Sequence, residues 1–173
     1  MVDPENELKI RAEILQKQVT AGDARALARV RVLGKAEDAA PLQRKHCLAV
    51  VAREVGFSSW NHALRVLRGD DREADFGTLL HDREAGGTLN AWFTTHAEAR
   101  AHLDARRVAG ECVYLLAYKR QFFVVEEAFV SALGLDPDDP HWRAIGFDWA
   151  RPSDRVARTR LYAKRLAALR RHA

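Results

Sequence analysis

The chain has 173 residues, of which 47% are hydrophobic and 30% are charged, a composition typical of globular proteins rather than disordered ones. No apolar run approaches the roughly 18 residues that a membrane-spanning helix requires. The acidic start MVDPENELK does not have the pattern of a secretory signal peptide. We therefore expect a cytoplasmic protein without a membrane partner.

The net charge of +4 is unevenly distributed along the chain. Residues 151–173 contain eight Lys or Arg and one Asp, a net charge of +7, so the preceding 150 residues carry a net charge of −3. Clustered basic residues attract phosphate backbones. The C-terminal end is therefore the first candidate binding surface.

The two cysteines, Cys47 and Cys112, lie 65 residues apart, and each belongs to an apolar run. Because the chain has no C-x-x-C pair, a zinc ribbon and a thioredoxin-type motif are excluded. The pattern predicts two buried free thiols in a reducing compartment. We expect no metal and no cofactor.

Residues 1–68 are predicted to form an all-helical module of four helices. Gly22 ends the first helix and Asp23 caps the second. After a loop at 34–41, a third helix ends near Gly56. A serine at 58 or 59 then caps a fourth helix, whose apolar residues recur at helical spacing: Trp60, Ala63, Leu64 and Leu67.

Two stretches of this module carry a family resemblance, LKIRAEILQKQVTAGDARALARV (8–30) and HCLAVVAREVGFSSW (46–60). Together, residues 8–67 resemble a small helical module that leads some bacterial ankyrin-repeat proteins and accompanies glyoxalase-superfamily domains. That module implies an all-helical fold but no activity that can be transferred. Residues 71–173 carry no such resemblance.

The segment VAREVGFSSWNHALRVL also resembles the helix-turn-helix of arabinose-regulator transcription factors. Ala52 and Gly56 stand four apart, as the turn of that motif requires. The resemblance implies a recognition helix bearing Ser58, Trp60, Asn61 and Arg65. The alternative is that these helices only pack together, because Trp60 also belongs to the apolar stripe.

The polar, glycine-bounded stretch RGDDREADFG indicates a linker over residues 69–77. In residues 78–173, VYLLAY and QFFVVE predict two strands that meet at Lys119 and Arg120. Helices are expected at about 97–107, after Glu126, and from about Ser153 to the end, with a rigid loop at DPDDPHW. The whole chain is therefore predicted to be α+β and predominantly helical, with a small sheet packed by helices.

The last helix combines an apolar stripe, formed by Val156, Thr159, Tyr162, Leu166 and Leu169, with many basic side chains. Such a helix can dock on the protein and still contact phosphates of DNA or RNA. We therefore predict a binding or regulatory protein associated with nucleic acid. The candidate contacts are Arg53, Arg65, Arg155, Arg158, Arg160, Lys164 and Arg165.

Two other functions are compatible with the sequence. Short amphipathic helices and an aromatic-rich second half would suit a protein-interaction module, such as an antitoxin, an immunity-type partner or a homodimer. A small enzyme is the further alternative, with a site at the 113–127 hairpin near Tyr118, Glu126 and Glu127. Neither a glycine-rich phosphate loop nor an H-E-x-x-H motif is present, and we assign no catalytic residue.

Overall fold

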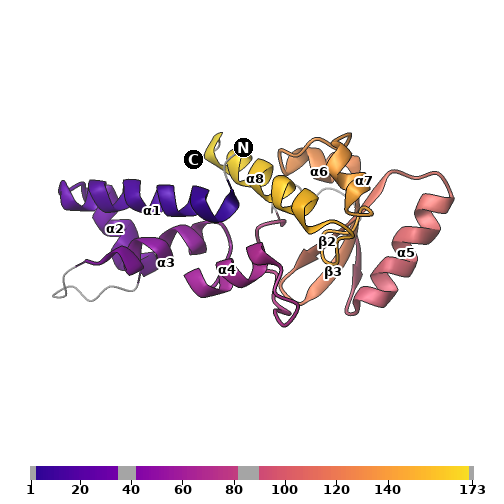
Figure 1. Cartoon of the computed structure of the whole chain (residues 1–173), viewed down its shortest axis with the longest axis horizontal. Coiled ribbons are helices and arrows are strands. Elements are labelled where there is room, and N and C mark those ends of the chain that lie inside the picture. The colour runs from indigo at the N-terminus through magenta and orange to yellow at the C-terminus, as the bar shows by residue number, and fades with distance from the viewer. Residues whose placement is uncertain (1–2, 35–41, 82–89, 172–173) are drawn as a thin grey trace.

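The computed structural model describes residues 3–34, 42–81 and 90–171, so the predicted loop at 34–41 lies almost entirely outside the described residues. Within these ranges the chain forms eight helices and one three-stranded sheet. This confirms the prediction of an α+β, predominantly helical fold. Helices α1–α4 lie at one end of an elongated molecule and the sheet lies at the other (Figure 1).

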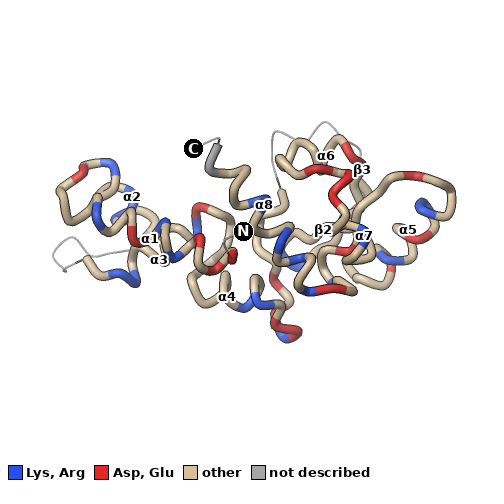
Figure 2. The backbone as a smooth tube through the Cα atoms, turned by 45° about the horizontal axis from the view of Figure 1, so that its top comes forward, with Lys and Arg blue, Asp and Glu red and all other residues tan. Residues whose placement is uncertain are grey.

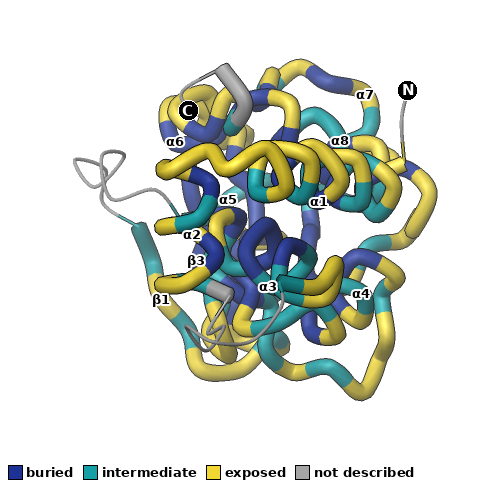
Figure 3. The backbone as a smooth tube through the Cα atoms, turned by 90° about the vertical axis from the view of Figure 1, so that its left-hand side faces the viewer, coloured by how far each residue is buried: buried dark blue, intermediate teal, exposed yellow. Residues whose placement is uncertain are grey.

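The four N-terminal helices are α1 (Pro4–Thr20), α2 (Ala24–Gly34), α3 (Arg44–Glu54) and α4 (Trp60–Arg68). Their caps follow the sequence: Asp23 Oδ1 accepts a hydrogen bond from the Ala26 N–H at 2.7 Å. Ser59 caps α4 by accepting from the His62 N–H at 3.1 Å. Helix α3 packs against the other three, and Figure 3 shows its buried surface at the centre of this group.

The sheet consists of β1 (Ala91–Phe93), β2 (Val113–Tyr118) and β3 (Gln121–Glu126), all antiparallel, with β3 in the centre. As the alternation of side chains predicts, successive residues of β2 enter two different cores. Helix α5 (His96–Val108) covers one face. Helices α6 (Glu127–Ala132), α7 (Pro140–Ala144) and α8 (Arg155–Arg171) supply core residues to the other face.

Helix α7 replaces part of the loop expected at DPDDPHW. Asp139 caps it by accepting from the His141 N–H at 3.0 Å, and Pro140 occupies its first turn. Proline is tolerated there because the first N–H groups of a helix have no partner within the helix. The prolines and aspartates that indicated a turn therefore begin a short helix.

Helix α8 connects the two ends of the molecule, since it packs against α1 and α4 as well as α7 (Figure 1). One continuous core contains residues from the N-terminal helices, the sheet and α8. Residues 69–77, predicted as a linker, run beside the β2–β3 turn: the Phe76 N–H donates to Lys119 O at 2.8 Å, and the Lys119 N–H donates to Gly77 O at 2.7 Å. No helix in the described ranges has the length and apolarity needed to cross a bilayer.

The buried face of α8 differs from the predicted apolar stripe. Val156 is 65% exposed, whereas the buried face carries two arginines between its apolar residues. Its apolar members are Ala157, Leu161, Tyr162, Leu166 and Ala168. Tyr162 and Leu166 of the predicted stripe are buried, but the stripe omitted Arg158 and Arg165, which are spaced seven apart and share this face.

Candidate anion-binding site

The basic residues predicted on α8 are mostly engaged inside the protein. Arg165 is 4% exposed and donates to two main-chain oxygens, Leu79 O at 3.0 Å and Leu133 O at 2.6 Å. Arg158 is 5% exposed, and Lys164 forms an ion pair with buried Asp139. This corrects the expectation that Arg158 and Arg165 lie on an open basic surface. Arg160 remains exposed.

The two arginines predicted in the N-terminal module also have local partners. Arg53 donates from Nε to Ser58 O at 3.3 Å and from Nη1 to Leu33 O. Arg65 Nε lies 2.7 Å from a carboxylate oxygen of Glu73. Figure 2 shows both basic and acidic residues along the backbone at each end of the molecule.

The hairpin does not bring its chemical groups together. Tyr118 pairs with Gln121 beside the turn, whereas Glu126 pairs with Val113 at the opposite end of the two strands. The arrangement predicted as a possible enzyme site is therefore spread along the full length of the hairpin. Glu126 instead forms an ion pair with Arg106 at 2.9 Å.

The two cysteines have different environments. Cys47 is 1% exposed, as predicted, whereas Cys112 is exposed, so the prediction of two buried thiols is wrong for Cys112. Cys112 precedes β2, outside the apolar part of its run. A hydrogen bond with the Glu127 carboxylate raises the pKa of the Cys112 thiol, because the negative charge beside it disfavours a thiolate.

His96 and His141 each pair with a buried carboxylate. His96 Nε2 lies 2.7 Å from Oδ2 of Asp148, a buried carboxylate that also accepts the Arg151 N–H at 2.9 Å. The Asp139 carboxylate contacts His141 Nδ1 and forms an ion pair with Lys164. In the described part of the chain, no group of three or more His, Cys, Asp or Glu could hold a metal ion.

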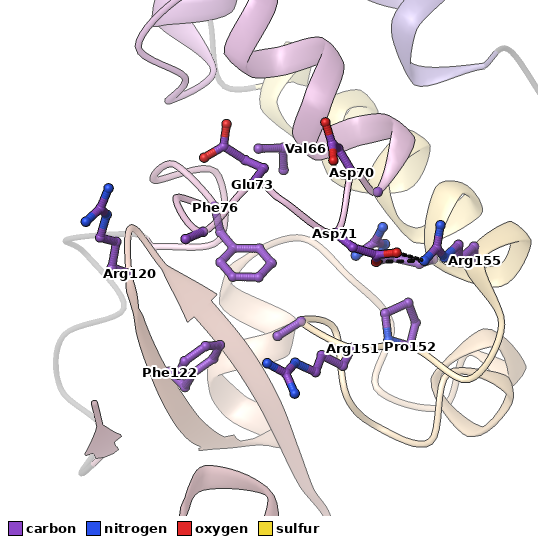
Figure 4. Close-up of a pocket in the computed structure, with 14 residues that line it drawn as sticks. Val66, Asp70, Asp71, Glu73, Phe76, Arg120, Phe122, Arg151, Pro152 and Arg155 are labelled. Carbon is purple, nitrogen blue, oxygen red and sulfur yellow. Dashed lines mark hydrogen bonds and ion pairs between the residues drawn. The ribbon is translucent and has the colours of Figure 1, made fainter. Parts of the chain in front are cut away.

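A cleft of about 570 Å³ lies between α4, the β2–β3 turn and the start of α8, and we call it the arginine cleft (Figure 4). Its volume is within the range of about 300–1,000 Å³ that small-molecule sites occupy. Three stretches far apart in sequence form its walls. The lining residues are Val66, Gly69, Asp70, Asp71, Glu73, Ala74, Phe76, Arg120, Phe122, Ala150, Arg151, Pro152, Arg155 and Arg158.

Positive charge is in excess in the arginine cleft. Of its three carboxylates, Asp71 pairs with Arg155 at 2.7 Å and Glu73 pairs with Arg65 at 2.7 Å. Burial raises the pKa of Glu73, but hydrogen bonds from the Asp75 N–H and from Arg65 outweigh burial and lower it. The Glu73 carboxylate is therefore ionised, and Arg65 balances its charge. Two further arginines of the wall, Arg120 and Arg151, form no side-chain ion pair with any residue that the structure describes.

Arg158 forms the buried part of this wall. Its Nη1 donates to Trp149 O at 3.3 Å, but Nε has no hydrogen-bond acceptor among the described residues. A buried donor without a partner costs roughly 1–3 kcal/mol, more for a charged group. Gly69, at φ +72°, ends α4 directly against this guanidinium, and a Cβ there would collide with Arg158 Nη2. The end of α4 therefore packs directly against the guanidinium of Arg158, one of whose N–H donors has no acceptor among the described residues.

The arginine cleft can bind an anion through planar guanidinium groups, which match phosphate and carboxylate oxygens in pairs of hydrogen bonds. Arg155 and Arg158 were predicted as phosphate contacts, but on the surface of a helix. Arg120 and Arg151 were missed because no spacing connects the hairpin turn with the start of α8. The polar composition of residues 69–77 was the only available signal, and it was interpreted as a linker.

Comparison with known proteins adds no relative to this description. The chain matches no protein-family model, no curated protein and no solved structure. The interpretation of the arginine cleft therefore depends on its own geometry and charge.

Proposed function

We propose that this protein is a binding protein whose arginine cleft takes a ligand bearing a phosphate group. The observation that carries the proposal is the gathering of four arginines in one cleft, of which Arg120 and Arg151 form no ion pair with any described residue. A phosphate would supply acceptor oxygens to several of these groups at once. Arginine is well suited to such contacts because its donors form a fixed planar fork.

The exposed Asp71–Arg155 pair does not block such a ligand. The side chain of Asp71 is 84% exposed and that of Arg155 is 58% exposed, so solvent and salt screen the pair strongly. Exposed pairs of this kind contribute about 0–1 kcal/mol. A phosphate can therefore recruit Arg155 at small cost.

This proposal moves the phosphate contacts predicted for the basic helix into the cleft. Of the helix residues, Arg155 and Arg158 line the cleft, whereas Lys164 and Arg165 are held by Asp139 and by main-chain oxygens. Arg160 alone among these five keeps its side chain on the outer surface without a described partner. A nucleic acid bound along the helix would depend on Arg160, which provides a way to separate the two binding modes.

The test is isothermal titration calorimetry with inorganic pyrophosphate at low salt, on the wild type, Arg151→Gln and Arg160→Gln. The Arg151 side chain has no structural partner in the described chain, so its replacement should preserve the fold. Losing one charged hydrogen bond of about 1.5–3 kcal/mol should weaken binding roughly 10- to 150-fold in Arg151→Gln. Arg160→Gln is the matched control and should bind like the wild type.

Circular dichroism of both variants should confirm an unchanged fold before binding is compared. Saturable binding that weakens only in Arg151→Gln supports the arginine cleft. Absence of saturable binding at low salt, or an equal loss in Arg160→Gln, would contradict the proposal.

A further inference from the structure

The floor of the arginine cleft is aromatic. The rings of Phe76 and Phe122 meet edge to face, with centroids 6.0 Å apart. Both rings are half-buried, so part of each surface faces the cleft (Figure 4). An apolar ring surface held open beside several arginines is suited to a ligand that has a flat, weakly polar part in addition to its charge.

These rings are held in place from behind. The main chain of Phe76 is hydrogen-bonded to Lys119 O at 2.8 Å, and the His96 ring packs edge-on against Phe122 with centroids 5.5 Å apart. His96 is fixed in turn by its 2.7 Å contact with the buried carboxylate of Asp148. A preorganised surface loses little conformational entropy when a ligand binds.

The opposite wall offers a third kind of chemistry. Asp70 is exposed and lines the cleft together with Arg151 and Arg155. One oxygen of Asp70 accepts the Arg72 N–H at 3.0 Å, which fixes the carboxylate and leaves its remaining lone pairs as acceptors. Asp70 disfavours a simple anion relative to a ligand that also carries hydroxyl groups, because hydroxyl groups would donate hydrogen bonds to its carboxylate.

We infer that the ligand of the arginine cleft is a mononucleotide, an inference that rests on the proposed function. Its phosphate meets Arg151 and Arg158, its base stacks on the ring of Phe76 beside Phe122, and its ribose hydroxyls face Asp70. Inorganic phosphate would leave the rings uncovered, and a sugar phosphate has no flat ring to place on them. The volume of about 570 Å³ suits one nucleotide rather than a long polynucleotide.

The test compares three probes by calorimetry on the full chain: adenosine monophosphate, ribose 5-phosphate and inorganic phosphate. Stacking of a base on an aromatic side chain corresponds to roughly 5- to 150-fold in affinity. We therefore expect adenosine monophosphate to bind at least 5-fold more tightly than ribose 5-phosphate. Both should bind more tightly than inorganic phosphate, because ribose adds donors for Asp70.

Phe76→Leu should reduce the affinity for adenosine monophosphate to that for ribose 5-phosphate and leave ribose 5-phosphate binding unchanged. Leucine keeps an apolar side chain against the core but removes the flat ring. Phe93→Leu is the matched control, because Phe93 packs against the same core and does not line the cleft. It should leave the binding of both probes unchanged.

The outcomes separate the inference from the proposed function. Equal affinities for adenosine monophosphate and ribose 5-phosphate would overturn the mononucleotide inference, while the phosphate-binding proposal would stand. A 12-nucleotide single-stranded RNA that binds more tightly than adenosine monophosphate and loses affinity in Arg160→Gln would overturn it in favour of a nucleic acid. If none of the three small probes binds, both the inference and the proposed function fail.

Discussion

Replacing Arg165 with methionine tests whether this arginine is a structural residue. Its guanidinium donates to Leu79 O at 3.0 Å and to Leu133 O at 2.6 Å, and the side chain is 4% exposed. These bonds join the segment before the sheet to the end of α6. Methionine fills much of the same space but cannot donate a hydrogen bond, so both buried oxygens lose a donor.

The magnitude follows from those two contacts. A buried carbonyl left without a donor costs roughly 1–3 kcal/mol, so two of them cost about 2–6 kcal/mol. Removing the charge also removes the unfavourable desolvation of a buried guanidinium, which offsets part of that loss. We expect Arg165→Met to lower the free energy of unfolding by about 3 kcal/mol, a large share of the usual 5–15 kcal/mol.

The assay is urea unfolding followed by circular dichroism, with Arg160→Met as the matched control on the same helix. Arg160 is exposed, so its replacement should change stability by no more than about 0.5 kcal/mol. Arg165→Met should lower the unfolding midpoint while the slope stays unchanged. Equal stability of the two variants would refute the reasoning. A loss of nucleic-acid binding at unchanged stability would restore the helix-surface hypothesis.

Substitutions at Gly56 and Glu5 and the reactivity of Cys112 test other parts of the structure. Gly56→Ala should destabilise the protein by about 1–3 kcal/mol more than Gly110→Ala. Both glycines have positive φ, but only at Gly56 would an added Cβ meet neighbouring backbone, at 2.8 Å. Thermal unfolding of the two variants measures the difference. Hydrogen bonds from Arg68 and then Lys9 lower the pKa of Glu5 from 4.5 to about 2. The stability that Glu5 contributes should therefore be complete above pH 4.5 and lost as the pH falls through 2. The difference in the free energy of unfolding between the wild type and Glu5→Gln should disappear over that pH interval. Ellman's reagent should modify Cys112 in the folded chain and both cysteines after denaturation, and rapid modification of both in the folded chain would contradict the burial described above.

Local sequence determined most of the helices and two of the three strands, but neither β1 nor α7 was predicted. Asp23 and a serine at 58 or 59 were predicted as helix caps, and the structure has Asp23 and Ser59 in these roles, because a cap acts on N–H groups only a few residues away. The run VYLLAY predicted a strand, and its residues enter two different cores because side chains of a strand point alternately to either side. These signals depend on neighbours in the chain and can be read without a partner segment.

Tertiary structure alone decided which charged groups remain available for binding. Nothing local distinguishes Arg165, which is buried against two distant carbonyl groups, from Arg160, which stays exposed on the same helix. The arginine cleft likewise joins residues 66–76, 120–122 and 150–158, whose contact depends on the packing of α8 against both ends of the molecule. The identity of a side chain fixes its charge, but its partners in the folded chain determine whether the charged group is paired inside the protein or accessible for binding.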